Sequence, residues 1–494
     1  MSSHTSPNTH ANNTYMLNNA IHRLRENRVL LPQFSQLGSP DRIPSHILSA
    51  LRDIDPDEPH PLNLWRVHWY NDETRRGIQN VPAHLVLGSE VTGIPSPIVV
   101  LLGARFPMIS AHKVLAAYGC LVPRLVNGEF DPTQHRALWP STGNYCRGGV
   151  AISRILGCRG VAILPAGMSA ERFAWLKRWV LEESDIICTP GTESNVKEIY
   201  DKCNELRLDP QNVILNQFAE YGNYLVHHHL TGKAMADVIH SHPGLQARAF
   251  VSATGSAGTL AAGDFLKEHL GTKIVAVEAA ECPTLLANGF GEHNIQGIGD
   301  KHVPLIHNVM NTDFVAAISD RSTDALHVLF NHKDGQRYLI ERRGVAPKMV
   351  DALANLGFSA ICNILAAKKT AQYLRLKETE AVVTVATDSA AMYVSEIPKN
   401  QARLFPKGFD SISAAETYGQ HMLGVSTDLL CELSLRDRER IFNLGYFTWV
   451  EQQGVPLAQF EERRDQRFWQ KLRAQVPQWD EAILSLNQRT GMLA

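Results

Sequence analysis

Residues 251–260, VSATGSAGTL, have the composition of an anion-binding loop. They follow an apolar run at 249–252 and precede a helical pattern at 260–269. A strand, a turn of small residues and a helix bring backbone N–H groups and a helix N-terminus together around an anion. Phosphate is the commonest anion at such a turn. We therefore interpret residues 255–259 as a phosphate cradle.

Three kinds of phosphate site compete for this loop. A Walker loop requires Gly-x-x-x-x-Gly-Lys-Ser/Thr, and the absence of a lysine from the stretch excludes it. A dinucleotide fold fits, because Ala253, Gly255 and Gly258 form A-x-G-x-x-G. In that fold Glu278, near the end of the next strand, would be the ribose-binding acid. The third is the phosphate loop of a pyridoxal phosphate enzyme, which needs a lysine, a ring-nitrogen partner and a substrate-carboxylate loop elsewhere.

Lysine usage singles out one residue. Lys113 is the only lysine between residues 1 and 176, where the other basic side chains, histidines aside, are arginine. It lies in FPMISAHKVLAAYG, just beyond the apolar run at 98–102. Apolar neighbours favour the neutral amine that forms a Schiff base. The competing interpretation is a surface lysine on an exposed helix.

A second group of polar residues stands before a predicted helix that ends near Leu156, with Gly157 as its cap. The group consists of Ser141, Thr142, Gly143, Asn144 and Tyr145. Hydroxyls and free N–H groups at the start of a helix can hold a carboxylate. The same residue types also form ordinary N-caps, so the loop by itself leaves both interpretations open.

The elements that must position these residues alternate along the chain. Short apolar runs separated by helical patterns of roughly 10 to 15 residues indicate βαβ units and a parallel sheet. The predicted class is therefore α/β. The expected strands are 98–102, 161–165, 185–189, 213–218, 249–252, 273–279 and 381–387.

Composition narrows the kind of ligand and the compartment. With a net charge of −2, the 494-residue chain has no electrostatic footprint for nucleic acid or an acidic membrane, which leaves a small molecule as the expected ligand. Eight cysteines without C-x-x-C pairs suit reduced thiols, and no apolar run approaches a bilayer span. We expect a cytoplasmic protein. The histidines of 227–229 and 240–242 lack a completing cysteine or carboxylate pattern, so no metal is expected.

In chain order, these motifs resemble the fold-type II pyridoxal phosphate enzymes, the family of cysteine synthase, cystathionine beta-synthase, threonine synthase and the tryptophan synthase beta chain. The resemblance covers roughly residues 80 to 400. Within it, SAHK at 110–113 resembles the lysine motif of the tryptophan synthase beta chain, and HNIQGIG at 293–299 resembles the glycine-rich segment of the family. The segment GFSAICN at 357–363 resembles the family's G-x-S-S-G region, although about 40 extra residues lie between 319 and 359.

The resemblance implies a role for each motif. Lys113 would hold pyridoxal 5'-phosphate and act as the base at the α-carbon, and Asn144 would hydrogen-bond the 3'-hydroxyl of the cofactor. The phosphate would be held by Gly255, Ser256, Ala257, Gly258 and Thr259. The substrate would be held by Ser141, Thr142, Gly143, Tyr145, Gln217 and Gly297. Ser389 would face the pyridine nitrogen, with Asp388 as its rival.

A neutral hydroxyl at the pyridine nitrogen makes the ring a modest electron sink. The resemblance therefore implies β-elimination or β-replacement on a serine- or cysteine-like L-amino acid, through an aminoacrylate intermediate. Three alternatives stay open: a threonine synthase or dehydratase type of lyase, a NAD-dependent oxidoreductase, and a ligand-sensing relative without activity. The last is motivated by Pro107–Ala111, where the family has N-P-T-G-S.

The resemblance also divides the chain and predicts its assembly as a homodimer. Residues 1–75 form an N-terminal extension without visible chemistry, and residues 76–118 with 227–410 form a large cofactor-binding domain. Residues 119–226 form a small, mobile domain that carries the substrate loop. Residues 411–494 form a helical C-terminal extension, which is expected to pack on the body or on a second subunit.

Overall fold

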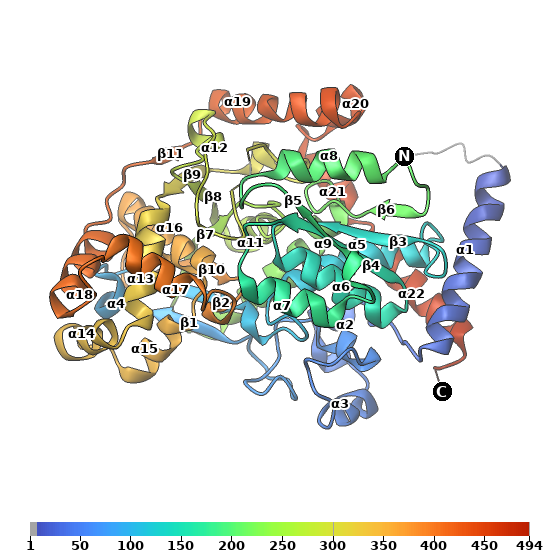
Figure 1. The fold of residues 1–494 in the computed structure, drawn as a ribbon, viewed down its shortest axis with the longest axis horizontal. Coiled ribbons are helices and arrows are strands. Elements are labelled where there is room, and N and C mark those ends of the chain that lie inside the picture. The colour runs from blue at the N-terminus through green and yellow to red at the C-terminus, as the bar shows by residue number, and fades with distance from the viewer. Residues whose placement is uncertain (1–6, 300, 494) are drawn as a thin grey trace.

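Two β-sheets organise the chain in a computed structural model that describes residues 7–299 and 301–493 (Figure 1). The larger sheet has seven strands in the order β1-β2-β10-β7-β8-β9-β11. Its strands are β1 His84–Leu87, β2 Ile98–Leu102, β7 Gln246–Ala253, β8 Lys273–Ala279, β9 Phe314–Ile318, β10 Glu380–Ala386 and β11 Leu430–Glu432.

The five central strands of the larger sheet run parallel, as the alternation of strands and helices predicted. Apolar side chains cover both of its faces: Val99 and Val383 belong to one core, and Val100 and Val382 to the other. Strands buried on both faces read as continuous apolar runs, which is why these strands stand out in the sequence. The edge strands β1 and β11 pair antiparallel, and the sequence analysis did not anticipate them.

The smaller sheet is parallel throughout, in the order β5-β4-β3-β6. Strand β3 was not predicted, and β6 is shorter than predicted, because the Asn216 side chain accepts from the Phe218 N–H and turns the chain. The strands are β3 Arg136–Pro140, β4 Arg159–Pro165, β5 Ile186–Thr189 and β6 Asn212–Ile214. Their helices are α6 Asn144–Leu156, α7 Ala170–Trp179 and α8 Val196–Leu206. Helix α6 ends at Gly157 in the left-handed conformation, as predicted.

Helices cover both faces of the larger sheet. One face packs on a core that includes α5 Lys113–Val126, α9 Tyr221–Val226, α10 Gly232–His240 and α11 Ala261–Leu270. A π-helical turn, η5 His227–Thr231, joins α9 to α10. The other face packs on α16 Phe358–Leu374.

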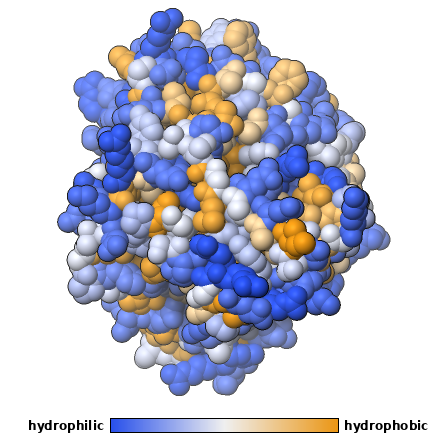
Figure 2. All heavy atoms as spheres, turned by 90° about the vertical axis from the view of Figure 1, so that its left-hand side faces the viewer, coloured by the Kyte–Doolittle hydropathy of each residue, from blue (hydrophilic) through white to orange (hydrophobic). Residues whose placement is uncertain are grey.

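Most of the extra residues between 319 and 359 form three helices, α13 Asp320–Asn331, α14 Lys333–Arg343 and α15 Pro347–Ala354. They lie with α4 Ser89–Thr92, α17 Glu396–Leu404 and α18 Ser411–Tyr418 on the left of Figure 1. Figure 2 shows this side as a largely hydrophilic surface interrupted by separate hydrophobic patches. Exposed apolar side chains on these elements and the turn after them include Ile340, Ile412 and Leu423.

The two terminal regions pack on each other beside α5. Helix α1 (Pro7–Glu26) and helix α2 (Phe34–Gly38) both contact α22 (Val476–Thr490). The Asp480 carboxylate accepts from the Phe34 N–H at 2.6 Å, and the Asn487 side chain donates to the Leu31 carbonyl at 2.8 Å. A third bond, from the Tyr118 hydroxyl to the Pro32 carbonyl at 2.5 Å, ties this pair of termini to α5. The C-terminal extension thus packs on the body of its own chain.

Helices α19 (Leu435–Tyr446) and α20 (Leu457–Glu462) lie at the top of Figure 1 and share a core with Val315 of β9. Helix α21 (Gln466–Arg473) instead contacts α9, and its Trp469 belongs to the core that contains α5. The Trp449 indole donates to the Val303 carbonyl at 2.7 Å and anchors this layer. Two short helices complete the description: α3 Ser45–Leu51 in the N-terminal extension and α12 Thr284–Ala287 after β8. Among the described residues, no helix is long and apolar enough to cross a membrane.

Candidate active site

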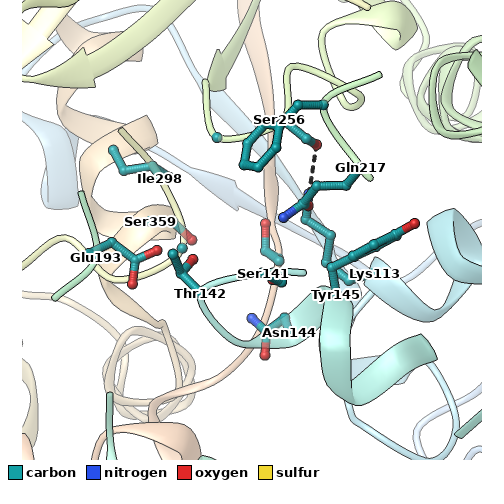
Figure 3. Close-up of a pocket in the computed structure, with 14 residues that line it drawn as sticks. Lys113, Ser141, Thr142, Asn144, Tyr145, Glu193, Gln217, Ser256, Ile298 and Ser359 are labelled. Atoms are coloured by element: carbon teal, nitrogen blue, oxygen red, sulfur yellow. Dashed lines mark hydrogen bonds between the residues drawn. The ribbon is translucent and has the colours of Figure 1, made fainter. Parts of the chain in front are cut away.

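A pocket lies between the two sheets, where the carboxyl ends of several strands meet (Figure 3). This is the edge at which open α/β sheets bind their ligands. The pocket is lined by Lys113, Ser141, Thr142, Asn144, Tyr145, Glu193, Gln217, Phe218, Gly255, Ser256, Gly297, Ile298, Ser359 and Thr387. A second pocket adjoins it and is lined by residues 252, 253 and 255–259 together with several of the same side chains.

The structure gathers most of the residues that the sequence singled out. Lys113, the phosphate cradle, the 141–145 loop, Gln217 and Gly297 all come together here, although they are far apart in the chain. Gly143 lies against the side chain of Arg172, because a Cβ at this position would be 2.5 Å from Nε of Arg172. Gly143 and Ser389 are the exceptions, since neither residue lines either pocket.

Lys113 is the first residue of α5, and its amine points into the pocket (Figure 3). Nζ donates to Oγ of Ser256 at 3.3 Å, so the lysine and the phosphate cradle are direct neighbours. Asn223 donates to the same hydroxyl at 3.0 Å and fixes it. The sequence interpretation of Lys113 as a site residue, rather than a surface lysine, is consistent with this geometry.

The loop before Lys113 is held by the N-terminal extension. Met108 and Ser110 have left-handed backbones, with φ of 65° and 49°, which costs about 1 kcal/mol each for residues with a Cβ. The Pro56 carbonyl accepts from the Met108 N–H at 2.9 Å, and Arg75 donates to the Ser110 hydroxyl at 3.3 Å. Both contacts come from the N-terminal extension. The extension, which showed no chemistry in the sequence, therefore positions the lysine loop.

His112 connects the extension to the cradle. Its ring is buried, lies 5.4 Å from the ring of Trp69, and places Nε2 3.2 Å from Oγ1 of Thr259. Burial, the neighbouring His227 and Lys113 hold the pKa of His112 well below its usual range. A neutral imidazole therefore stands behind the phosphate cradle.

In the phosphate cradle, the backbone lies very close to a neighbouring side chain. A Cβ on Gly258 would lie 2.2 Å from Oδ1 of Asn223, so only glycine fits against that side chain. Ala257 has a φ of 61°, which turns the chain sharply before α11 begins at Ala261. A turn of this kind exposes successive N–H groups to an anion.

The 141–145 loop starts α6, which packs tightly on the start of α5. A Cβ on Gly148 would lie 3.0 Å from the Lys113 carbonyl, and one on Gly149 would lie 1.9 Å from the Trp139 ring. The two glycines therefore allow the loop to approach the lysine. Within the loop, the Gly143 N–H donates to Oγ of Ser141 at 3.1 Å, and the Tyr145 hydroxyl donates to the Leu215 carbonyl at 3.1 Å.

The turn after β10 holds both residues that the sequence offers as partners of the pyridine nitrogen, Asp388 and Ser389. Ser389 forms an isolated backbone bridge with Leu356 and lies outside the pocket lining. The Asp388 carboxylate accepts from Asn144 at 2.6 Å and from the Tyr393 hydroxyl at 2.7 Å. Ser359, at the start of α16, lines both pockets instead. The extra helices α13–α15 obscured this residue in the sequence, although GFSAICN contained the signal.

A buried polar cluster under the loop was not predicted. Arg172, on α7, donates to the Gln296 side chain and, at 3.0 Å, to the Tyr393 hydroxyl. Burial raises the pKa of Glu193 to about 7, although Arg172, Thr142 and the Gly297 backbone oppose the shift. Glu193 follows β5 at its carboxyl end, which is the signal that sequence reasoning could have used.

Glu278 is used for a structural purpose. Its carboxylate accepts from the N–H groups of Leu285 and Leu286 at 2.9 and 2.8 Å, at the start of α12. The side chain is 2% exposed, so it does not present an acid to a ribose. This removes the residue on which the dinucleotide interpretation depended. Among the described residues, no group of three or more His, Cys, Asp or Glu is arranged to hold a metal ion.

Comparison with known proteins agrees with the geometry. The family of pyridoxal-phosphate dependent enzymes matches residues 106–388. The chain is 28% identical over 253 residues to cysteine synthase B of Campylobacter jejuni, an alignment that covers 50% of this chain and 75% of the relative. It is 27% identical over 259 residues to cysteine synthase 3 of Caenorhabditis elegans, covering 50% and 66%. An O-acetylserine dependent cystathionine beta-synthase from Helicobacter pylori shares the fold, with a TM-score of 0.53, 22% identity and coverage of 65% and 96%.

The fold and the site therefore define an α/β enzyme with a lysine and a phosphate cradle in a pocket between its two sheets. The chain belongs to the family of pyridoxal-phosphate dependent enzymes. Its fold is that of fold type II, and its cofactor is pyridoxal phosphate. The residues present fit this group: a glycine-lined cradle, a lysine amine at its edge and a hydroxyl, Ser359, on the other side of the pocket.

Proposed function

We propose that the enzyme catalyses β-elimination or β-replacement on a serine- or cysteine-like L-amino acid, as a cysteine synthase-like lyase or transferase. The observation that carries the proposal is the neutral Ser359 hydroxyl in the pocket with Lys113, while the nearest carboxylate after β10, Asp388, is bound by Asn144 and Tyr393. The similarity to cysteine synthases supports it.

Each group in the pocket has a role in this proposal. When bound, pyridoxal phosphate supplies an aldehyde for an amine and an electron-withdrawing ring that acidifies the α-carbon of an amino acid. Lys113 holds the cofactor and accepts the α-proton, and residues 255–259 hold its phosphate. Asn144 positions the cofactor's 3'-hydroxyl. The loop of Ser141, Thr142, Gly143 and Tyr145, with Gln217 and Gly297, holds the substrate carboxylate.

In this proposal Ser359, rather than Ser389, lies beside the pyridine nitrogen. A hydroxyl beside the pyridine nitrogen leaves that nitrogen largely unprotonated, so the ring stores little negative charge. Loss of a β-substituent must then follow closely on removal of the α-proton. This is why a hydroxyl favours chemistry at the β-carbon over racemisation or transamination.

We further propose that residues 119–226 move as a small domain against the larger one formed by 76–118 and 227–410. Contacts that cross this boundary include those of Asn144 with Asp388 and of Arg172 with Gln296 and Tyr393. Closure would exclude water from the pocket. We also propose a cytoplasmic homodimer. Among the described residues, which include all eight cysteines, no disulfide forms, and this supports the compartment. The separate apolar patches in Figure 2 offer surface for a second subunit.

The proposed activity is tested with cofactor-loaded enzyme and single candidate substrates. L-Serine, L-cysteine, O-acetyl-L-serine and O-phospho-L-serine are supplied with and without sulfide, and pyruvate, sulfide and cysteine are measured. At least one substrate should release pyruvate or give a β-replacement product. Racemisation or transamination of L-alanine without any β-product would contradict the proposal.

The carboxylate loop gives a second prediction. Thr142→Ala should weaken amino acid binding and leave the cofactor content unchanged, because the hydroxyl contacts substrate and not phosphate. A hydrogen bond to a charged group contributes roughly 1.5 to 3 kcal/mol, so affinity should fall about tenfold to a hundredfold. Titration of the cofactor absorbance measures the loss. Thr74→Ala, at an exposed threonine, is the control. Equal amino acid affinity in the two variants would mean that the 141–145 loop only caps α6.

A further inference from the structure

Glu193 is an acidic side chain in the part of the pocket that the proposed function gives to the substrate carboxylate. It lines the same pocket as Lys113 and is 1% exposed. Figure 3 shows it beside Thr142, on the side of the pocket away from Lys113. Thr142 and Gly297, which the proposed function assigns to the substrate, line the same pocket.

A positive charge lies under the same loop. Arg172 is fully buried, and its Nε, which has no hydrogen-bond partner among the described residues, lies 2.5 Å from where a Cβ on Gly143 would be. Burial opposes the charge, but Tyr393, Glu193 and Asp388 outweigh it and raise the pKa of Arg172. Arg172 is therefore a permanent cation behind a loop whose own side chains are neutral.

Asp388 is the other carboxylate that acts on Arg172 in this cluster. Its Oδ2 accepts from Asn144 and Tyr393, and its Oδ1 has no hydrogen-bond partner among the described residues. Glu193 has one oxygen, Oε2, without a hydrogen-bond partner among the described residues. The groups that act on Glu193 are Arg172 from α7, Asp388 from the turn after β10, and Tyr393 just beyond it.

We propose that Glu193 is a specificity-determining residue: it is the resident counter-ion of Arg172 in the carboxylate subsite, and an amino acid carboxylate binds there only when Glu193 is neutral. The inference rests on the proposed role of the 141–145 loop. Two ionised carboxylates cannot both lie beside Thr142 and Gly297 in a buried pocket without strong repulsion. Binding of the substrate carboxylate therefore requires a proton on Glu193.

The proposal predicts the direction in which pH changes the affinity for a ligand with a carboxylate. Burial raises the pKa of Glu193 to about 7, so the side chain is mostly neutral at pH 6 and mostly ionised at pH 8. If only the neutral form admits a carboxylate, the affinity for an amino acid relative to its amide should fall about tenfold between pH 6 and pH 8. A ligand without a carboxylate should escape this effect.

The test compares two ligands that lack a β-leaving group, L-alanine and L-alaninamide, on the cofactor-loaded enzyme at pH 6 and pH 8. Affinity is read from the cofactor absorbance or by calorimetry. In Glu193→Gln, L-alanine should bind about tenfold more tightly than in the wild type at pH 8 and equally at pH 6. L-Alaninamide should bind the two proteins equally at both pH values. Glu205→Gln, an exposed glutamate on α8, is the matched control and should behave as wild type.

The wild-type data keep the proposal testable if Glu193→Gln does not fold, because L-alanine must lose affinity between pH 6 and pH 8 relative to L-alaninamide. Equal pH dependence of the two ligands would overturn the proposal, and so would weaker binding of L-alanine to Glu193→Gln at pH 8. Neither ligand undergoes β-chemistry. Absence of β-elimination with an intact L-alanine titration would therefore refute the proposed function and leave Glu193's role standing.

Discussion

Lys113→Ala should remove activity almost completely, with a fall of at least about 10³-fold in kcat, because one side chain both holds the cofactor and moves the α-proton. In the wild type, borohydride reduction should fix the cofactor to the protein, remove its visible band and place the label on the peptide that contains Lys113. The variant should give no such label. Mass spectrometry of the reduced, digested protein measures both outcomes.

The control for this variant is Lys177→Ala, which removes an exposed lysine of α7 that pairs with Glu183. It should retain the label and the activity. A cofactor label on any lysine other than Lys113 would contradict the central assignment of the site. So would a wild-type protein that shows no visible band after incubation with pyridoxal phosphate, because the family assignment requires the cofactor to bind.

Ser359→Asp should change the type of reaction. A carboxylate beside the pyridine nitrogen would hold a proton there through a charge-assisted hydrogen bond of roughly 1.5 to 3 kcal/mol. The ring would then store negative charge, so β-elimination should slow about tenfold to a hundredfold, and racemisation of L-alanine should appear. Pyruvate release and the optical activity of L-alanine measure the two rates.

Ser389→Asp separates the two candidate partners of the ring nitrogen. Ser389 lies four residues before Tyr393 and outside the pocket lining, so its substitution should affect β-elimination less than that of Ser359. The opposite order would return the assignment to Ser389. Racemisation or transamination by the wild type itself would point to an acid, Asp388, as the partner and would exclude the proposed reaction class.

The sequence was most informative where structure follows from short-range patterns. The buried strands β2, β8 and β10 are continuous apolar runs, and Gly157 ends α6 because a left-handed residue closes that helix. The phosphate cradle and the lysine loop also follow from local composition. By contrast, β1 and β11 are short edge strands that form because they pair with β2 and β9. The local sequence pattern does not specify such a partner.

The less predictable parts of the site depend on long-range packing. Ser359 follows Gly357 closely in the chain, and Ser389 follows strand β10. Only the packing of α16 against β10 decides which of the two serines lines the pocket. Arg172 and Glu193 come from segments that carry no motif, and their importance arises from burial under the 141–145 loop. The role of the N-terminal extension was equally hidden, since Pro56 and Arg75 act on a loop some 35 to 50 residues away.

The packing of α1, α2 and α22 on one another beside α5 has a consequence for biosynthesis. The helix that begins with Lys113 leaves the ribosome about 350 residues before α22, yet α22 supplies Asp480 and Asn487 to the segment that covers it. The bond from Tyr118 to Pro32 then joins that segment to the lysine helix. The cover over the lysine helix is therefore complete only when nearly the whole polypeptide has been made.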